Sequence, residues 1–401
     1  MGDQPRLIVL ALVFIAGCAT ATSLQPVLHV EHINVVGREP MLVEHPSGAL
    51  FVAGYGEPRP TLWKSTDRGA TWSRVDVGTE ADGAIGNSDV ELAVAADGTL
   101  YFASMLYDRK VDEGQQIAIG SSSDIGASWH WTTVSKTRFD DRPWIEVAPD
   151  GTAHAIWNDG AGVAWSVSRD RGVTWTEMPR IHDQGGSSHL AIGPAGELAV
   201  RITPLSASGN KYDAGVDLIA VSTDGGATWQ KHAAPGERDW SPDFESDATP
   251  RWVEPLAWDA HGRLYSLWTD KKGVRLARSD DRGATWRTST VIDTATPAFF
   301  PYLIARGDDE LAATWFTASN NDMNDLRWQV AHIRGSRTTI SASQSLESRR
   351  RRGTGHDAPI FNDTAGEYLA LAFLRDGSIG VATPIQNWPE KRVGFTFWKF
   401  R

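Results

Sequence analysis

The sequence predicts an all-β fold, a single β-propeller of four-stranded antiparallel blades, from three observations. One eight-residue phrase is written five times along the chain. Pairs of apolar strands joined by short turns recur between its copies. No helical periodicity of useful length is present. A repeat period of about fifty residues indicates one supersecondary unit that is copied around an axis.

The phrase reads Ser-x-Asp-x-Gly-x-Thr/Ser-Trp, and its copies begin at Ser65, Ser122, Ser168, Ser222 and Ser279. Its Asp can accept hydrogen bonds from the backbone N–H groups of a tight turn, and its Gly can take a positive φ without steric cost. The Trp that ends the phrase offers a large apolar surface for packing between units. Because each polar group has a local backbone role, we expect the five Asp residues to be structural and not catalytic.

The apolar hairpins set the number of blades. Their turns centre near Gly48, Gly98, Gly151, Gly196, Gly262, Asp309 and Gly366. Each of the first five hairpins is followed by a copy of the phrase, and hairpin plus hairpin makes a four-stranded blade. We therefore favour seven blades, five of them carrying the phrase, with six blades as the alternative if two hairpins share one blade.

The two ends of the chain are expected to close the ring. The sixth unit has lost the phrase, and we expect the seventh to keep residues 378–385 and 393–400 as its outer strands. Degenerate terminal repeats are typical of repeat proteins. The segment from Leu28 to Val36 is a spare strand before the first hairpin, and we expect it to pair with the last blade.

The eight-residue phrase resembles the Asp-box, or bacterial neuraminidase repeat, which is found in sialidases and in other β-propeller proteins. The resemblance implies a sialidase-like propeller. Sialidase catalytic domains of that family have six blades, so the favoured count of seven departs from the family pattern.

The first 18 residues resemble a lipoprotein-type signal peptide that ends at a lipobox cysteine, and the propeller is expected to occupy residues 24–401. One Arg precedes an apolar stretch, which is followed by Ile15-Ala16-Gly17-Cys18. Cys18 is the single cysteine of the chain, so no intrachain disulfide can form. We expect an exported bacterial lipoprotein at the outer membrane or cell surface, held by a lipid on Cys18, with a secreted or periplasmic protein as the alternative.

Charge and motif content exclude several classes of function. The formal net charge of −11 disfavours nucleic-acid binding. No His-x-x-x-His motif, cysteine cluster or serine nucleophile elbow supports zinc hydrolysis or acyl-enzyme chemistry. The run from Asn320 to Asp325 offers oxygen atoms without the spacing of a calcium loop, and we interpret it as a polar loop. No metal or other cofactor is expected.

The expected topology gathers titratable residues on one face. In each blade the turns between strands one and two and between strands three and four share one face, which we call the lower face. The upper face is built from the segments that lead into each first strand. Those segments carry Arg38, Glu39, Asp89, Glu91, Asp140, Asp141, Arg142, His189, Arg251, Glu254, Tyr302, His356 and Asp357. This ring is either a functional cup or a channel lining whose groups are solvated and pair with one another.

The family resemblance assigns roles within this ring. The segment Arg38-Glu39-Pro40 resembles the Arg-Ile-Pro sequence that leads into the first sialidase strand, which implies that Arg38 binds a substrate carboxylate. Asp89 is then the candidate acid, and Glu254 with Tyr302 is the candidate nucleophilic pair. Arg142 and Arg251 are candidate partners of Arg38, chosen by their place in the blade.

The sequence leaves the function open between different classes. The first reading is a sialidase-like glycoside hydrolase, of exo-α-sialidase or neuraminidase type, that acts on anionic glycans. The alternative is a non-catalytic propeller that binds a glycan or protein partner at the cell surface. A lyase of uronic-acid polymers would need a base and a group that neutralises a carboxylate, roles that His189, Tyr302, His356 and the arginines could fill.

Overall fold

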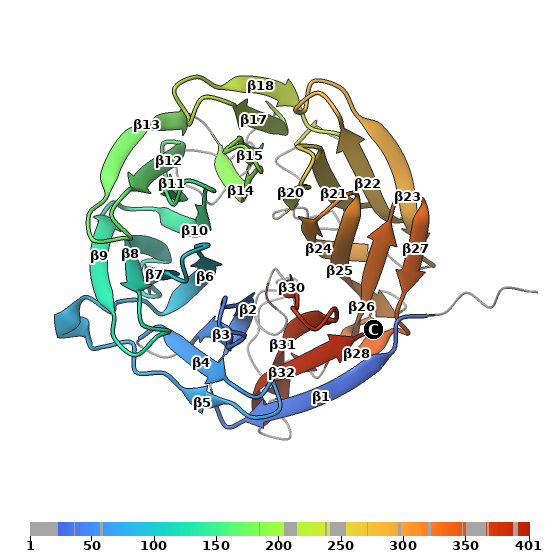
Figure 1. Ribbon diagram of the computed structural model, residues 1–401, viewed down its shortest axis with the longest axis horizontal. Helices are drawn as coiled ribbons and strands as arrows, with labels where there is room; N and C mark the ends of the chain where they lie inside the picture. The colour runs from blue at the N-terminus through green and yellow to red at the C-terminus, as the bar shows by residue number, and fades with distance from the viewer. Residues whose placement is uncertain are drawn as a thin grey trace, which may run out of the picture.

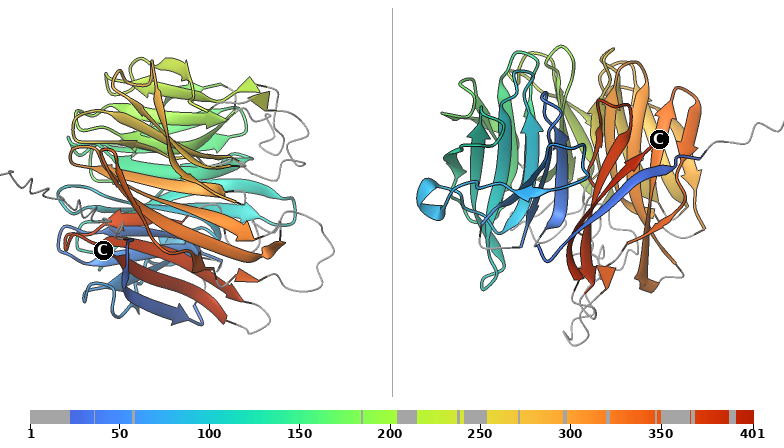
Figure 2. Two further views of the ribbon diagram at one scale, coloured as in Figure 1. Left: turned by 90° about the vertical axis from the view of Figure 1, so that its right-hand side faces the viewer. Right: turned by 60° about the horizontal axis from the view of Figure 1, so that its bottom comes forward.

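The computed structural model shows a closed ring of seven antiparallel blades (Figure 1), and we call the region that their innermost strands surround the central channel. It describes residues 23–35, 37–56, 59–183, 185–203, 215–236, 239–240, 254–270, 272–295, 298–319, 322–346, 348–349, 366, 369–387 and 392–401. The predicted signal peptide and Cys18 lie outside these residues. The strands of every blade run between the two faces of the ring (Figure 2).

The first four blades follow one another along the chain. Blade 1 contains β2 (Arg38–Glu44), β3 (Leu50–Tyr55), β4 (Thr61–Ser65) and β5 (Ser73–Arg74); blade 2 contains β6 (Ser88–Val94), β7 (Leu100–Asp108), β8 (Glu113–Ser122) and β9 (His130–Ser135). Blade 3 contains β10 (Asp140–Val147), β11 (Ala153–Asp159), β12 (Val163–Ser168) and β13 (Thr176–His182); blade 4 contains β14 (Gly186–Ile192), β15 (Leu198–Thr203), β17 (Leu218–Ser222) and β18 (Gln230–Ala233).

Three more blades complete the ring. Blade 5 contains β20 (Leu256–Trp258), β21 (Leu264–Asp270), β22 (Gly273–Ser279) and β23 (Arg287–Asp293); blade 6 contains β24 (Ala298–Arg306), β25 (Glu310–Ser319), β26 (Asp322–Arg334) and β27 (Arg337–Ile340), with β28 (Gln344–Ser345) beside β26. Blade 7 contains β30 (Leu371–Phe373), β31 (Ile379–Asn387), β32 (Arg392–Phe400) and β1 (Pro26–Ile33), with β29 (Ser348–Arg349) parallel to β31.

Among the described residues, three short elements lie outside the blades. A 3-10 helix, η1 (Glu80–Asp82), connects blades 1 and 2. The short strands β16 (Gly215–Val216) and β19 (Asp239–Trp240) pair with each other beside blade 4. Among the residues that the model describes, no helix has the length and apolar character needed to cross a membrane.

The ring closes by pairing of strands from the two ends of the chain, as predicted from the extra strand before the first hairpin. β1 pairs antiparallel with β32 over Pro26–Ile33 and becomes the outermost strand of blade 7. The rings of His29 and Trp398 stack at 3.7 Å across this pair. The closure therefore joins the first and last strands in sequence within one sheet.

The seventh hairpin differs from the prediction in the position of its turn and in the order of its strands within the blade. Its turn lies at Gly377, where the Gly377 N–H donates to Leu374 O, and not at Gly366. The hairpin loop of blade 7 reads Leu-Arg-Asp-Gly-Ser, which has the same Asp-Gly turn as the hairpins at Gly98 and Gly151. In consequence residues 378–385 and 393–400 form the second and third strands of the blade, because β1 supplies the fourth.

The Asp-box phrases are tight turns with the expected hydrogen bonds. In blade 1 the Asp67 carboxylate accepts from the hydroxyl of Ser65 at 2.8 Å and from both the backbone N–H and the hydroxyl of Thr71. These bonds, those from Thr71 first, lower the pKa of Asp67 to about 2. The same set recurs in the other four copies. The five Asp residues are structural turn groups.

Each Asp-box also packs against the preceding blade. The box glycine of blade 4, Gly226, has φ +87° and lies so close to Trp165 of blade 3 that a Cβ there would be 2.0 Å from the indole ring. The box Trp229 packs edge-on against the same ring at 5.8 Å. The glycine is thus needed both for its backbone conformation and for the contact between blades.

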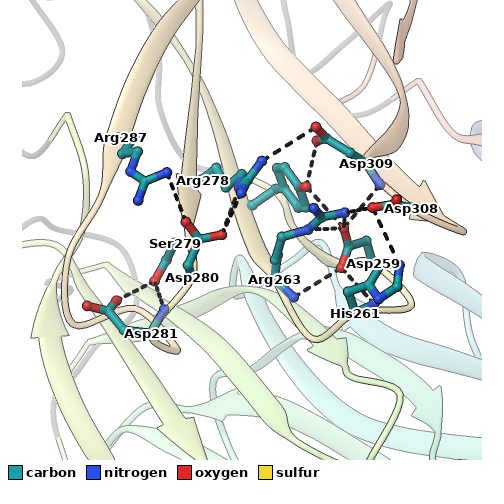
Figure 3. A network of polar contacts seen from close by, with 11 residues as sticks. Asp259, His261, Arg263, Arg278, Ser279, Asp280, Asp281, Arg287, Asp308 and Asp309 are labelled. Carbon is teal, nitrogen blue, oxygen red and sulfur yellow. Dashed lines mark hydrogen bonds and ion pairs between the residues drawn. The ribbon is translucent and has the colours of Figure 1, made fainter. Parts of the chain in front are cut away.

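Box turns and hairpin turns share the lower face, as the up-and-down topology requires. Arg171 of the blade 3 box forms an ion pair with Asp97 in the hairpin turn of blade 2, at 2.9 Å. Figure 3 shows a similar network between blades 5 and 6, in which Arg278 contacts Asp280 of the box at 2.8 Å and Asp309 of the next hairpin turn at 3.5 Å. The upper face is therefore the one opposite these turns.

Candidate functional site in the central channel

Three innermost strands begin with the same backbone irregularity. The sequences Arg38-Glu39-Pro40, Asp141-Arg142-Pro143 and Phe299-Phe300-Pro301 occupy equivalent places in blades 1, 3 and 6. The residue before proline has a positive φ in each, +44° at Glu39, +50° at Arg142 and +45° at Phe300. The strand register also shifts at each of these places.

These bulges re-aim the side chains that follow them. Non-glycine residues with positive φ cost on the order of 1–3 kcal/mol, and such strain concentrates at functional sites. Directly after the proline stand Met41, Trp144 and Tyr302, so the three strands present large side chains at one level. The recurrent pattern of two residues followed by proline is the sequence signal that links these three positions, whereas the family resemblance covers blade 1 alone.

Aromatic and imidazole rings from three blades meet at the channel. The His189 ring of blade 4 lies 5.9 Å from the Tyr302 ring of blade 6 and 5.0 Å from the Trp144 ring of blade 3. All three side chains are buried. Burial lowers the pKa of His189 to about 3, so its ring is neutral at neutral pH. His189 Nδ1 accepts a hydrogen bond from the Leu256 backbone N–H at 3.4 Å, which leaves the proton on Nε2.

Two carboxyl groups face the same Tyr302 from other blades. Glu91 of blade 2 and Glu146 of blade 3 each act electrostatically on Tyr302, whose pKa is raised well above its usual value by burial first and by these two groups second. Burial, and then the charge of Glu146, raise the pKa of Glu91 well above its usual range. We call Glu91, Glu146, His189, Trp144 and Tyr302 the channel cluster.

The two carboxyl groups differ in their surroundings. Glu91 is 8% exposed, and its Oε2 has no hydrogen-bond partner among the described residues. Glu146 is exposed at the surface of the channel. The surrounding protein nevertheless reduces the solvation of its carboxylate, which raises its pKa to about 7. A buried carboxyl oxygen without a partner is costly, so Glu91 is suited to the protonated form or to a ligand that donates to it.

A second group of side chains lies at the junction of blades 1 and 2. The Arg38 guanidinium stands 5.3 Å from the centre of the Tyr55 ring, and the Tyr55 hydroxyl bonds to Glu39. Burial, then Glu39, raise the pKa of Tyr55 well above its usual value, while Arg38 opposes this shift. Asp89 is close enough to act on Tyr55 and accepts from the Ser88 hydroxyl at 3.2 Å.

The structure thus brings Arg38 and Asp89, two of the predicted site residues, into one group. Asp89 stands two positions before Glu91 on β6, which connects this group to the channel cluster. Tyr55 and Glu39 were not assigned roles from the sequence. Tyr55 is the last residue of the buried apolar strand LFVAGY. Its local sequence therefore resembles that of a core residue and does not indicate a functional role.

Glu254 occupies a different environment from Tyr302. Its carboxylate forms an ion pair with Arg201 of blade 4, and Arg201 also pairs with Asp217; all three side chains are fully buried. A buried carboxylate needs such a partner, because an unpaired charge in the interior costs several kcal/mol. Glu254 joins blade 4 to blade 5 through this pair, and the carboxyl groups that act electrostatically on Tyr302 are those of Glu91 and Glu146.

The remaining predicted positions are placed in part. Arg142 is half-buried at the bulge of blade 3. Arg251, His356 and Asp357 lie outside the described residues. Of the three arginines predicted to bind a carboxylate, two therefore have known places, at equivalent bulges of blades 1 and 3. Among the described residues, no group of three or more His, Cys, Asp or Glu side chains could hold a metal ion.

Comparison with known proteins supports the fold. The family model described as BNR/Asp-box repeat matches residues 220–231. No curated protein matches the sequence. An ulvan lyase of polysaccharide lyase family PL25, bound to a GlcA(1-4)Rha3S unit, aligns with 11% identity and TM-score 0.56 over 92% of this chain and 95% of its own.

Two further solved structures align at similar identity. A GH74 xyloglucanase from Xanthomonas campestris aligns with 14% identity and TM-score 0.54, over 92% of this chain and 55% of its own. The intramolecular trans-sialidase from Ruminococcus gnavus aligns with 13% identity and TM-score 0.43, over 91% of this chain and 94% of its own. The box turns and the ring of four-stranded blades identify this chain as a seven-bladed β-propeller with Asp-box repeats.

Proposed function

We propose that this protein is an enzyme that processes anionic glycans in its central channel, by glycoside hydrolysis of the sialidase type. The observation that carries the proposal is the convergence of Glu91, Glu146 and Tyr302 from three different blades, with a buried Glu91 oxygen that lacks a partner among the described residues. A sugar hydroxyl or a glycosidic oxygen is the kind of group that such an oxygen would bind. Propellers that act on glycans, such as the ulvan lyase and the xyloglucanase, support a glycan substrate, and the GlcA(1-4)Rha3S unit bound to the lyase is anionic.

The electrostatics of the channel suit an anionic sugar. Burial raises the pKa of Glu91 well above its usual range, which favours its protonated form, and Glu146, with a pKa of about 7, is ionised in part at neutral pH. The channel therefore presents less negative charge than its residue types suggest. Arg38 and Arg142, with Arg251 predicted as a third, would bind the carboxylate of the sugar, because a guanidinium matches a planar anion with two parallel hydrogen bonds.

The proposed chemistry uses Tyr302 as nucleophile. Its phenol proton passes to ionised Glu146 as the oxygen bonds to the anomeric carbon, while protonated Glu91 gives its proton to the leaving glycosidic oxygen as that bond breaks. Water then attacks the anomeric carbon as its bond to the tyrosine oxygen breaks. Glu91 takes a proton from that water, and Glu146 returns its proton to the phenolate, so both carboxyl groups and the tyrosine are restored. A neutral phenol avoids bringing an anionic nucleophile to an anionic sugar. Glu146 is suited to exchange protons at neutral pH because its pKa is about 7.

The test is release of fluorophore from an aryl α-sialoside by protein that begins after Cys18. We expect Tyr302→Phe and Glu146→Gln to lower kcat by about a hundredfold or more. Tyr107→Phe is the matched control, because Tyr107 donates its phenol proton to Asp112 in a surface hairpin of blade 2. An active Tyr302→Phe protein would refute the nucleophile assignment, and a wild-type protein without turnover would refute the sialidase reaction.

A lyase reaction on a uronic-acid polymer is the second candidate, favoured by one observation. The neutral His189 ring lies 5.9 Å from the Tyr302 ring in the channel and carries its proton on Nε2, which provides a hydrogen-bond donor for a uronate carboxylate beside a phenol. The fold shared with the ulvan lyase points to the same substrate class. Such a reaction removes a proton beside the carboxylate and expels the glycosidic oxygen, and it leaves a carbon–carbon double bond that absorbs ultraviolet light. Ultraviolet-absorbing product from a polyuronate, without sialoside turnover, would select this candidate.

Binding without chemistry is the remaining outcome. Calorimetric binding of an anionic glycan with no product would identify a recognition propeller that holds a glycan or protein partner. We further propose, from the sequence, that the protein is an exported lipoprotein anchored through Cys18 at the outer membrane or cell surface, with secretion or a periplasmic location as the alternative.

A further inference from the structure

Two cavities open on the lower face, away from the channel cluster, at the seam where the ring closes. The first, of about 450 Å³, lies between blades 7 and 1 and is lined by charged groups from the hairpin turns and from the first Asp-box. The second, of about 250 Å³, lies between blades 6 and 7 beside the start and the end of the described chain. Figure 1 places the C-terminus near the start of β1 at this part of the rim.

The side chains that line the two cavities are strongly basic. The cations are Arg68, Arg334, Arg337, Arg375, Lys399 and Arg401, and the anions are Glu44 and Asp376. His332 adds an ionisable group to the second cavity. This excess of cations contrasts with the formal net charge of −11 for the whole chain. We call this part of the lower face the basic seam.

Ion pairs hold the basic seam in place and leave it cationic. Asp376 accepts from Lys399 at 2.5 Å in the first cavity and contacts Arg401 at 3.5 Å in the second, so one carboxylate connects both. Outside the second cavity Glu310 contacts Arg334 at 2.7 Å and His332 at 2.8 Å. Because Glu310 also pairs with Arg306, each of these two carboxylates is shared among several cations.

The basic seam lies close in sequence to the predicted lipid attachment residue. Ser23 and Leu24 line the second cavity, five and six positions after Cys18, the residue at which the sequence predicts a lipid. Gln25 exchanges backbone hydrogen bonds with Arg401, which fixes the start of the described chain to this rim. An anchor of this length holds the lower face close to the membrane.

We propose that the basic seam binds the phosphate headgroups of anionic phospholipids and so orients the propeller on the membrane. Guanidinium and ammonium groups near an anionic bilayer each contribute on the order of 1 kcal/mol to binding. One lipid chain alone gives marginal and reversible anchoring, so a basic surface beside it supplies the second attachment that stable binding needs. The lower face then lies on the membrane, and the mouth of the channel at the upper face points away from it.

The test separates the basic seam from the lipid. Protein that begins at Ser23 keeps all seven blades and the closing strand β1, because β1 starts at Pro26. Its partitioning is measured by sedimentation with vesicles of phosphatidylcholine, alone or mixed with phosphatidylglycerol. We expect binding to the mixed vesicles and not to the neutral ones, and we expect this binding to weaken as salt is raised.

Matched charge variants locate the surface. The triple variant Arg334→Gln, Arg337→Gln, Arg401→Gln should bind the mixed vesicles about a hundredfold more weakly, because each arginine contributes about fivefold. The control removes as many exposed arginines elsewhere, with Arg138→Gln, Arg180→Gln and Arg287→Gln, whose side chains are 69%, 45% and 80% exposed.

Melting temperatures of both variants show that the ring is intact. Equal loss in the two triple variants would overturn the proposal, as would binding that ignores phosphatidylglycerol. Binding of a soluble anionic polysaccharide in place of the vesicles would overturn it as well. None of these outcomes depends on turnover in the channel.

Discussion

Replacement of the box glycine of blade 4 by alanine tests how the blades are held together. Gly226 has φ +87°, and an alanine Cβ at this position would lie 2.0 Å from the Trp165 ring and would push against a fully buried side chain. The neighbouring Gly225 has φ +67°, but a Cβ there would meet nothing within 4 Å. The pair therefore separates the cost of the backbone conformation from the cost of the contact.

The magnitudes follow from these two terms. A left-handed backbone conformation costs a non-glycine residue about 1–2 kcal/mol, and overpacking a core costs a further 1–3 kcal/mol. We expect Gly225→Ala to lower the free energy of unfolding by about 1 kcal/mol and Gly226→Ala by about 2–5 kcal/mol. For a protein of this length the entropy of unfolding is roughly 0.8 kcal/mol/K, so 4 kcal/mol lowers Tm by about 5 °C.

The assay is urea denaturation followed by tryptophan fluorescence, with calorimetry for Tm. Because Trp165 is itself the contacted side chain, its emission also reports any movement of the indole ring. Equal destabilisation by the two substitutions would refute the reasoning, since only the backbone term is common to both. A Gly226→Ala protein with an unchanged free energy of unfolding would show that the box does not pack tightly against the preceding blade.

Three further predictions concern a buried ion-pair network, a buried histidine and the predicted lipid attachment. Arg201→Met should destabilise the protein by about 3–5 kcal/mol, because it leaves Asp217 and Glu254 buried beside an uncharged side chain; urea midpoints check this, and a loss below 1 kcal/mol would contradict it. Burial lowers the pKa of His154 to about 4, below the unfolded value of about 6.5, so the folded state favours the neutral imidazole. The free energy of unfolding should therefore fall by about 3 kcal/mol as the pH drops from about 6.5 to about 4. His154→Gln should reduce this fall when the free energy of unfolding is measured against pH, and an unchanged fall would contradict the prediction. Cys18→Ser should abolish incorporation of labelled fatty acid and move the protein out of the membrane fraction, whereas a labelled variant would exclude Cys18 as the modified residue.

The sequence by itself determined the repeat and its turns. Each Asp-box is closed by hydrogen bonds that span four residues, as between Asp67 and Thr71, so its conformation is written in the local sequence. Periodic hairpins then gave the number of blades, and the spare first strand gave the closure. The one misplaced turn, Gly366 for Gly377, fell where the repeat is least regular.

The tertiary structure alone decided which side chains meet. Glu91, Glu146, His189 and Tyr302 come from four blades that are separated by dozens of residues, and their encounter depends on the twist of each blade and on the bulges that begin the inner strands. The same holds for Glu254, which the sequence paired with Tyr302 and the structure places on Arg201. Local hydrogen bonding fixes a turn, whereas a site between blades depends on packing over the whole ring, which no short segment of sequence encodes.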